Sequence, residues 1–325
     1  MMLTYQTVLP GVLMLVLASV TQAAGILQLR DKDSAKTFDL NTSAIQKRAD
    51  GVLALMSYSV IIDLASSNLS IQGSGNDKET LAMSQLGGGA TISKETPLYL
   101  EGAVAYSRYD PTFVATDGTD ERKIPLKWTT VSGSGGIGWD FPISENWVVR
   151  PIFTFSLGKV ASDLKLANWW IERQTDRELN FADGGSMNAL GLGGALMVDY
   201  EYVSPEFEYD LELRYSAVHL QGFANGNSID GEADSQTANL WTRYRAPTGL
   251  TVFSRPLRYV LEFSHSRYYG DQAGALGFDY LSTLGAGIEF DSTAYTSFIT
   301  RTRLLGRYMF GQNVDGFGIS LACSF

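Results

Sequence analysis

The sequence predicts an all-β protein, a transmembrane antiparallel up-and-down β-barrel of about twelve strands with a short N-terminal helix in its lumen as a further option. Three observations predict this fold class. Segments alternate between apolar and polar residues, the connections between them alternate between short and long, and the last strand ends on an aromatic residue. The 325 residues are also rich in glycine (33), tyrosine (16) and phenylalanine (16).

The N-terminal residues 1–23 are predicted to be a signal peptide. Residues 8–20 are apolar, and the small residues Ala23 and Ala24 that follow suit cleavage by a signal peptidase. No Lys or Arg precedes Arg30, so the alternative is an uncleaved anchor helix that extends to Leu29. The leader therefore favours a secreted chain.

Residues 24–50 form a polar segment between this leader and the barrel, which is assigned to residues 51–325. Asn41 or Thr42 is a suitable N-cap, and Lys47 and Arg48 suit the C-terminal end of a helix. The segment is therefore expected to plug the lumen as a helix or to form a disordered periplasmic tail.

Period-2 alternation bounded by turn residues predicts the strands of the barrel in order. They are residues 58–71, 81–93, 97–109, 126–141, 147–159, 186–202, 206–220, 235–246, 255–269, 279–291, 295–310 and 316–325. Several are longer than the ~9 to 11 residues that a tilted strand needs to cross a bilayer.

The connections between these strands differ in length in a regular way. Short links are expected at 94–96, 144–146, 203–205 and 292–294, with a somewhat longer one at 247–254. Longer polar loops are expected at 72–80, 110–125, 160–185, 221–234 and 270–278. Short periplasmic turns and long extracellular loops are typical of outer-membrane barrels of Gram-negative bacteria, and an even strand count places both chain ends in the periplasm.

Charged residues are expected to line the lumen. In residues 206–215 the even positions are all charged and the odd positions are all apolar, and ionised groups on the lipid face would be costly. The same comparison of even and odd positions in the other strands gives the full set of inward charges, here named the charge ladder. Its residues are Arg150, Glu206, Glu208, Asp210, Glu212, Arg214, Arg243, Arg245, Arg258, Glu262, Arg301, Arg303 and Arg307. Ion pairs between them would make the lumen narrow or partly closed.

The C-terminal strand has one apolar face, formed by Phe317, Ile319, Leu321, Cys323 and Phe325. A terminal aromatic of this kind resembles the C-terminal signal that the bacterial barrel-assembly machinery reads. The expected location is the outer membrane, and the expected partners are its lipid and, during biogenesis, that machinery. Cys323 is interpreted as a small packing or lipid-facing residue, and the oligomeric state is left open.

Several function classes are disfavoured. A net charge of −10 argues against a nucleic-acid partner, and no cofactor or metal is predicted. The serines beside His265 point to the opposite strand face, so a lipid hydrolase built on this histidine is a weak alternative. The glycine-rich run at 133–138 lies within a strand and is interpreted as room for close packing. Trp169 and Trp170, in a long loop, are the candidate surface contact.

The leader, the candidate helix, the strand count and the strand at 317–325 together resemble the translocator β-domain of autotransporters over residues 42–325. That resemblance implies a twelve-stranded barrel filled by a helix that leads from an exported passenger. Only about 25 residues separate the cleavage site from the first strand, so the chain resembles a solitary, passenger-less form. A non-catalytic structural or surface-interaction role follows, and a small channel for polar solutes is the alternative.

Overall fold

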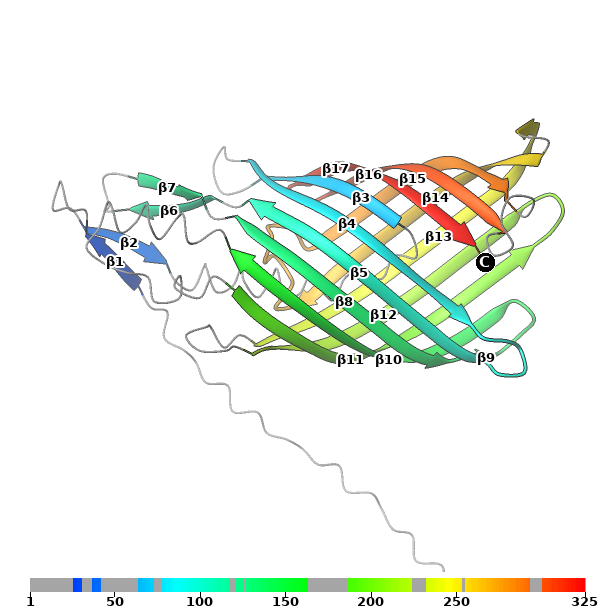
Figure 1. The fold of residues 1–325 in the computed structure, drawn as a ribbon, viewed down its shortest axis with the longest axis horizontal. Helices are drawn as coiled ribbons and strands as arrows, with labels where there is room; N and C mark the ends of the chain where they lie inside the picture. The colour runs from blue at the N-terminus through cyan, green and yellow to red at the C-terminus, as the bar shows by residue number, and fades with distance from the viewer. Residues whose placement is uncertain are drawn as a thin grey trace, which may run out of the picture.

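A computed structural model describes residues 26–30, 37–41, 64–72, 78–110, 112–116, 121–125, 127–162, 186–223, 232–252, 255–292 and 300–324. The regular elements in these residues are all β-strands. Twelve of them form a closed antiparallel barrel, which confirms the predicted fold class (Figure 1). No helix in these ranges is long and apolar enough to cross a membrane.

The barrel strands overlap all twelve predicted segments. They are β3 (Leu64–Gln72), β4 (Lys78–Thr91), β5 (Leu98–Asp110), β8 (Trp128–Trp139), β10 (Trp147–Ser162), β11 (Ser186–Val203), β12 (Glu208–Phe223), β13 (Glu232–Val252), β14 (Arg255–Gly270), β15 (Tyr280–Asp291), β16 (Arg301–Gly311) and β17 (Val314–Ser324). The short β9 (Phe141–Pro142) pairs with the start of β10. Pairing of β17 with β3 closes the barrel, so neither terminal barrel strand presents an open edge to lipid.

The two ends of the barrel differ in their connections. Residues 92–97, 140–146 and 204–207 link strands at one end, here named the short-turn end. The opposite, long-loop end carries the connections 111–127, 163–185, 224–231 and 271–279. One connection at the long-loop end is nevertheless tight, because only Gln312 and Asn313 join β16 to β17, and Asn313 adopts φ 58°.

The predicted link at 247–254 is wrong in extent. The strands β13 and β14 continue to Val252 and Arg255, and their register shifts between Pro247 and Thr251 before pairing resumes. Proline removes one ladder donor and Gly249 adopts φ 77°, so these residues make an irregularity within the hairpin. Pro247 and Gly249 therefore mark an irregularity within the paired strands.

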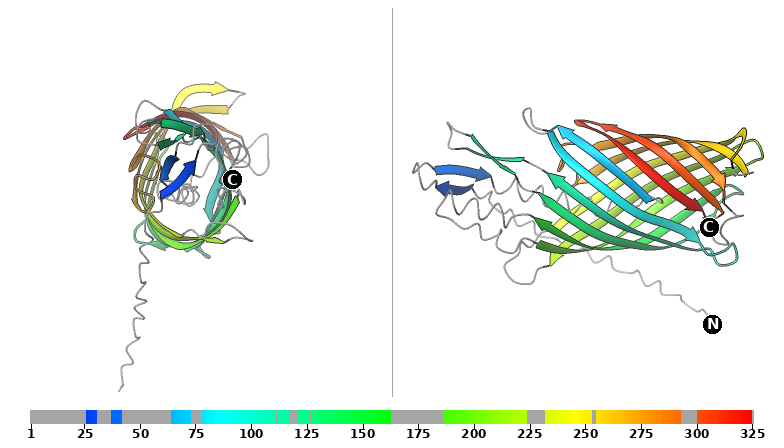
Figure 2. Two further views of the ribbon diagram at one scale, coloured as in Figure 1. Left: turned by 90° about the vertical axis from the view of Figure 1, so that its left-hand side faces the viewer. Right: turned by 45° about the horizontal axis from the view of Figure 1, so that its top comes forward.

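A second sheet lies beyond the long-loop end of the barrel (Figures 1 and 2). It has the order β1 (Ile26–Arg30), β2 (Thr37–Asn41), β6 (Thr112–Thr116) and β7 (Glu121–Pro125), none of which the sequence predicts. The link between its two hairpins is the pairing of Asp39 with Thr116. Viewed end-on, β1 and β2 lie over the opening of the barrel (Figure 2). The expected signal peptide and the residues of the expected helix after Asn41 lie outside the described residues.

Side chains alternate between the inner and outer faces of each barrel strand. In β5, Ala103 and Ala105 are buried, whereas Leu100 and Val104 are exposed on the outer face. The outer face is a surface of large apolar side chains, as lipid contact requires. Four aromatic residues, Tyr99, Tyr109, Trp128 and Tyr268, have buried side chains and do not contribute to this surface.

Outward-facing aromatic rings form a row across β10 to β14 near the short-turn end. Their centroids are 4.7 Å apart for Trp147 and Tyr200, 6.3 Å for Tyr200 and Tyr209, and 6.0 Å for Tyr244 and Tyr259. Rows of tyrosine and tryptophan mark the boundary between hydrocarbon and headgroups. This aromatic row therefore fixes the inner limit of the membrane on one side of the barrel.

We expect Ile319→Arg to lower the free energy of unfolding by about 2–4 kcal/mol, because it places a cation on the lipid face near the middle of β17. Ile319 is 65% exposed on that face. Urea unfolding in phosphatidylcholine vesicles, followed by tryptophan fluorescence, measures the change. Gln312→Arg, in the turn between β16 and β17, is the matched control and is expected to change stability by less than about 0.5 kcal/mol. Equal losses in both variants would contradict the assignment of the lipid face.

Candidate functional site in the lumen

Twelve of the thirteen residues of the predicted charge ladder lie on barrel strands, on β10, β12, β13, β14 and β16. Glu206 does not, and its assignment to the lumen is wrong. This residue is exposed in the turn at 204–207, and β12 begins two residues later at Glu208. Alternation in the sequence continues through this turn, where the structure no longer has a strand.

The inner face encloses a cavity of about 490 Å³ lined by charges of both signs. Glu212 on β12, Arg243 on β13 and Arg307 on β16 are among the lining residues. Arginine and carboxylate side chains reach one another here mainly between neighbouring strands. The lumen wall is therefore a set of ion-pair networks.

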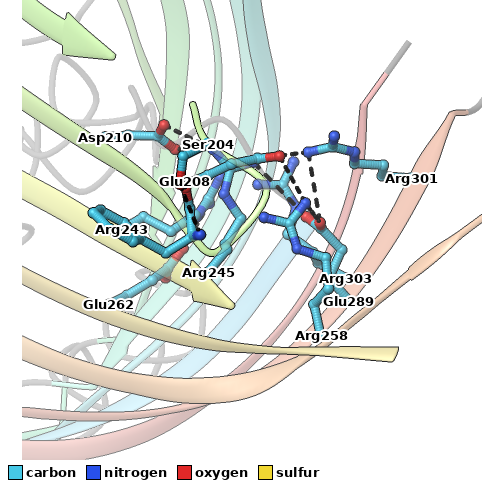
Figure 3. A network of polar contacts seen from close by, with 11 residues as sticks. Ser204, Glu208, Asp210, Arg243, Arg245, Arg258, Glu262, Glu289, Arg301 and Arg303 are labelled. Atoms are coloured by element: carbon cyan, nitrogen blue, oxygen red, sulfur yellow. Dashed lines mark hydrogen bonds and ion pairs between the residues drawn. The ribbon is translucent and has the colours of Figure 1, made fainter. Parts of the chain in front are cut away.

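The largest network gathers near the short-turn end, around Glu208 on β12 (Figure 3). Its carboxylate lies 2.8 Å from Arg258 Nη1, 2.7 Å from Arg301 Nη1 and 3.3 Å from Arg245 Nη1. Arg245 also reaches Asp210 at 2.6 Å. Charge-assisted bonds of this kind are stronger than neutral ones, and several around one carboxylate offset its desolvation.

Glu289 on β15 is the second centre of this network, and sequence analysis missed it. Its side chain is fully buried and lies 3.2 Å from Arg303 Nε and 3.3 Å from Arg258 Nη1. Alternation within β15, where Leu284, Ala286 and Ile288 face outward, was the signal that would have found it. Four arginines, Arg245, Arg258, Arg301 and Arg303, thus surround three carboxylates, Glu208, Asp210 and Glu289.

A second group joins β13, β14 and β16 through one carboxylate. Glu262 accepts from Arg243 at 2.6 Å and from Arg307 at 2.7 Å. The Arg243 guanidinium also lies over the ring of Trp241, 4.5 Å from its centroid. All three charged side chains are less than 10% exposed, so the two cations share a buried anion.

Another ion pair also connects strands that are not neighbours in the sheet. Arg214 on β12 donates to both carboxylate oxygens of Glu101 on β5, at 2.8 and 2.7 Å. Strands β8, β10 and β11 separate these two in the sheet, so the pair bridges a curved section of the inner wall. A Cβ atom at Gly136 would stand 2.6 Å from Glu101 Oε1, so this glycine of the 133–138 run leaves room for the bridge.

Arg150 on β10 belongs to a further cluster near the short-turn end. It donates to Asp140 and lies 3.4 Å from Asp199 on β11, and its guanidinium lies 4.0 Å from the ring centroid of Tyr99. Sequence analysis found Arg150 but not these two acidic partners. Asp140 could not be found by strand parity, because it lies between β8 and β9.

The two histidines make contacts away from the lumen. His265 Nδ1 lies 2.9 Å from Ser282 Oγ on the outer face, and His219 Nδ1 lies 2.7 Å from Asp234 Oδ1. Ser282 is 6% exposed, and the described residues place no carboxylate on His265 to orient it. They also contain no group of three or more His, Cys, Asp or Glu residues able to hold a metal ion.

Of the remaining predicted site residues, Phe317, Ile319 and Leu321 lie on the outer face of β17 and are exposed. Trp169, Trp170 and Phe325 lie outside the described residues.

Residues 25–164 match the family model described as the autotransporter beta-domain. Over these residues the chain is similar to the autotransporter β-domain. The chain is a barrel of the outer membrane that is similar to translocator domains. The matched stretch includes the second sheet and barrel strands β3 to β10. That family is one of translocator barrels rather than of enzymes.

Three solved autotransporter structures are similar to this barrel. The β-domain of the Bordetella autotransporter BrkA has 12% identity and a TM-score of 0.45, over 80% of this chain and 98% of that one. The translocator domain of NalP from Neisseria meningitidis has 11% identity and a TM-score of 0.41, over 86% and 95%. The transport unit of AIDA-I from Escherichia coli has 13% identity and a TM-score of 0.44, over 86% and 99%. No curated protein matches the sequence.

We expect Glu262→Gln to lower the free energy of unfolding of this barrel by about 3–5 kcal/mol, because it removes the buried anion that two arginines share. The control is Asp110→Asn, which removes one partner of the half-exposed pair with Lys127 at 2.9 Å. An exposed pair contributes at most about 1 kcal/mol. Urea unfolding in vesicles compares the two variants. A loss for Glu262→Gln no larger than for Asp110→Asn would contradict the importance of the lumen network.

Proposed function

We propose that this barrel holds its own N-terminal hairpin, β1 and β2, at the outer surface of the cell, and that it catalyses no reaction. The observation that carries the proposal is the pairing of β2 with β6. Strand β6 follows β5 after one residue, and both β6 and β7 belong to the connection between β5 and β8 at the long-loop end. Pairing with β6 therefore places Asn41 at that end.

The first barrel strand begins at the opposite end. Leu64 pairs with Leu321, close to the C-terminal end of β17 at the short-turn end. Short turns face the periplasm and long loops face the medium in barrels of this class. The chain must therefore cross the thickness of the membrane between Asn41 and Leu64, from the outside inward.

Charge argues for the lumen as the route of this crossing. Residues 42–63 include Lys47, Arg48, Asp50 and Asp63, and each of these charges would be costly in contact with lipid. The inner wall already accommodates many charged side chains, and a helix of this length would span about 33 Å, enough for the hydrocarbon core. The proposal thus keeps the idea of a lumen plug, which was predicted for residues 24–50, but assigns it to residues 42–63. It places the hairpin that precedes this segment at the cell surface. The lack of a passenger stays a prediction.

We expect an epitope inserted between Asp33 and Ser34, in the link between β1 and β2, to bind antibody on intact cells. The same epitope between Ser144 and Glu145, at the short-turn end, is the control and is expected to bind only after the outer membrane is permeabilised. Flow cytometry of the two strains, with and without permeabilisation, measures both. An N-terminal epitope that is silent on intact cells would overturn the surface placement.

The alternative role as a channel makes a different prediction in planar bilayers. We expect the intact mature barrel to be closed and a variant lacking residues 25–50 to conduct, because the deletion removes part of the segment assigned to the lumen. Arg303→Ala in the truncated background is expected to change ion selectivity, since Arg303 lines the cavity. Steady conductance of the intact chain would instead support the channel role.

A further inference from the structure

Two cations lie on the outer face of the strands that flank β8, near the long-loop end. Arg108 on β5 pairs with Thr129 on β8, and Lys159 on β10 pairs with Val131, two residues away on β8. Both charged side chains are exposed. The register separates their Cα atoms by two strand spacings and two residues, which is ~12 Å. Two long basic side chains at that separation can reach one anion between them.

The aromatic row fixes the height of Lys159. This residue lies twelve residues beyond Trp147 on β10. At ~3.3 Å per residue and a tilt of about 45°, twelve residues raise the chain by about 28 Å above the inner limit of the membrane. The apolar band of an outer-membrane barrel is about 25 Å tall. Lys159 therefore lies at the level of the headgroups of the outer leaflet.

Arg108 lies at nearly the same height. The register slopes upward from β10 to β12, because the aromatic row crosses β12 at Tyr209, two residues nearer the short-turn end than the register partner of Tyr200. Two steps in the opposite direction, from Lys159 to Tyr106 on β5, lower the chain by about 7 Å, and the two residues from Tyr106 to Arg108 raise it by about 5 Å. Arg108 thus lies about 26 Å above the aromatic row.

Charges near this height are distributed unevenly around the barrel. On the outward face of β4, β5, β8, β10 and β11 near the long-loop end, Asp110 is the only carboxylate among the described residues, and it pairs with Lys127 at 2.9 Å. The arc from β12 to β17 instead carries three exposed carboxylates near this end, Asp234, Asp271 and Asp315. The summed charges therefore attract anions to the first arc and repel them from the second.

We propose that Arg108 and Lys159 bind a phosphate group of a phosphorylated glycolipid in the outer leaflet, with the hydroxyl of Thr129 as a further donor between them. Phosphate accepts charge-assisted hydrogen bonds from both cations, and a guanidinium binds two of its oxygens at once. Both residues lie on the lipid-facing side of their strands, so the site opens along the membrane rather than toward the medium. A lipid headgroup fits this direction.

This lipid site does not depend on the surface hairpin proposed above, because none of its residues belongs to β1, β2, β6 or β7. Failure of the epitope experiment would therefore leave lipid binding unaffected, and a failure to bind lipid would leave the hairpin at the surface.

Native mass spectrometry of the full-length protein in mild detergent tests the site. The probe is an acylated glucosamine disaccharide with two phosphates, offered with a chelator so that divalent cations do not bridge it to the carboxylates of β12 to β17. We expect Arg108→Ala and Lys159→Ala each to reduce the bound fraction several-fold, and the double variant to reduce it about tenfold. Heat-modifiable migration in gels shows that each variant folds.

Arg267→Ala is the matched control. Arg267 is an exposed arginine on the outer face of β14, within the arc that carries the carboxylates. Its replacement removes the same charge from the rim and is expected to leave lipid binding unchanged. Equal losses in Arg267→Ala and Arg108→Ala would show a general attraction of the rim for anionic lipid and would overturn the site.

Two further probes identify the group that is recognised. The same glycolipid without its phosphates is expected to lose most of its binding, and retention of this lipid would overturn the proposal. Inorganic phosphate at millimolar concentration is expected not to displace the intact glycolipid, because it lacks the acyl chains that hold the headgroup at the surface of the barrel. Displacement by inorganic phosphate would show a site for a free anion, and the assignment to a lipid would be wrong.

Discussion

The structure depends on one constraint, the need to pair every backbone N–H and C=O group where the chain passes through hydrocarbon. Closure of β17 on β3 and of β10 on β11 meets this need around the whole circumference. A closed sheet then has one face in lipid and one face toward the lumen. Because successive side chains of a strand point to opposite faces, the sequence must alternate between apolar and polar residues. The apolar outer face and the charged lumen are consequences of this closure.

The lumen charges follow from the same geometry. Inward side chains from five neighbouring strands converge, so a buried carboxylate such as Glu289 meets arginines from β13, β14 and β16. Pairing offsets the desolvation of each ion, yet replacing the ions with apolar groups would often be neutral for stability. The networks are better understood as a constraint on the wall, because the loss of one shared anion leaves several cations without it. Sharing makes the strands of this half of the barrel interdependent.

Sequence patterns predicted each barrel strand because alternation is a local property. Sequence patterns did not predict contacts between residues that are far apart in the sequence. The partner of Arg214 is Glu101, more than a hundred positions away, and only the curvature of the closed barrel brings them together. Alternation was also misleading at Glu206, which extends the pattern into a turn. Strands β1, β2, β6 and β7 are too short to show a period.

The distribution of inner side chains also makes the lumen asymmetric. Strands β12 to β16 contribute most of the arginine and glutamate side chains, whereas β5 and β8 contribute several small ones, Ala103, Ala105, Ser107 and Ser132, beside the larger Tyr99 and Glu101. The small side chains of β5 and β8 fill less of the lumen than the charged side chains of β12 to β16. Residues 42–63 carry lysine, arginine and aspartate, whose charges can pair with those of β12 to β16. The asymmetry thus favours an occupied lumen over an evenly lined pore.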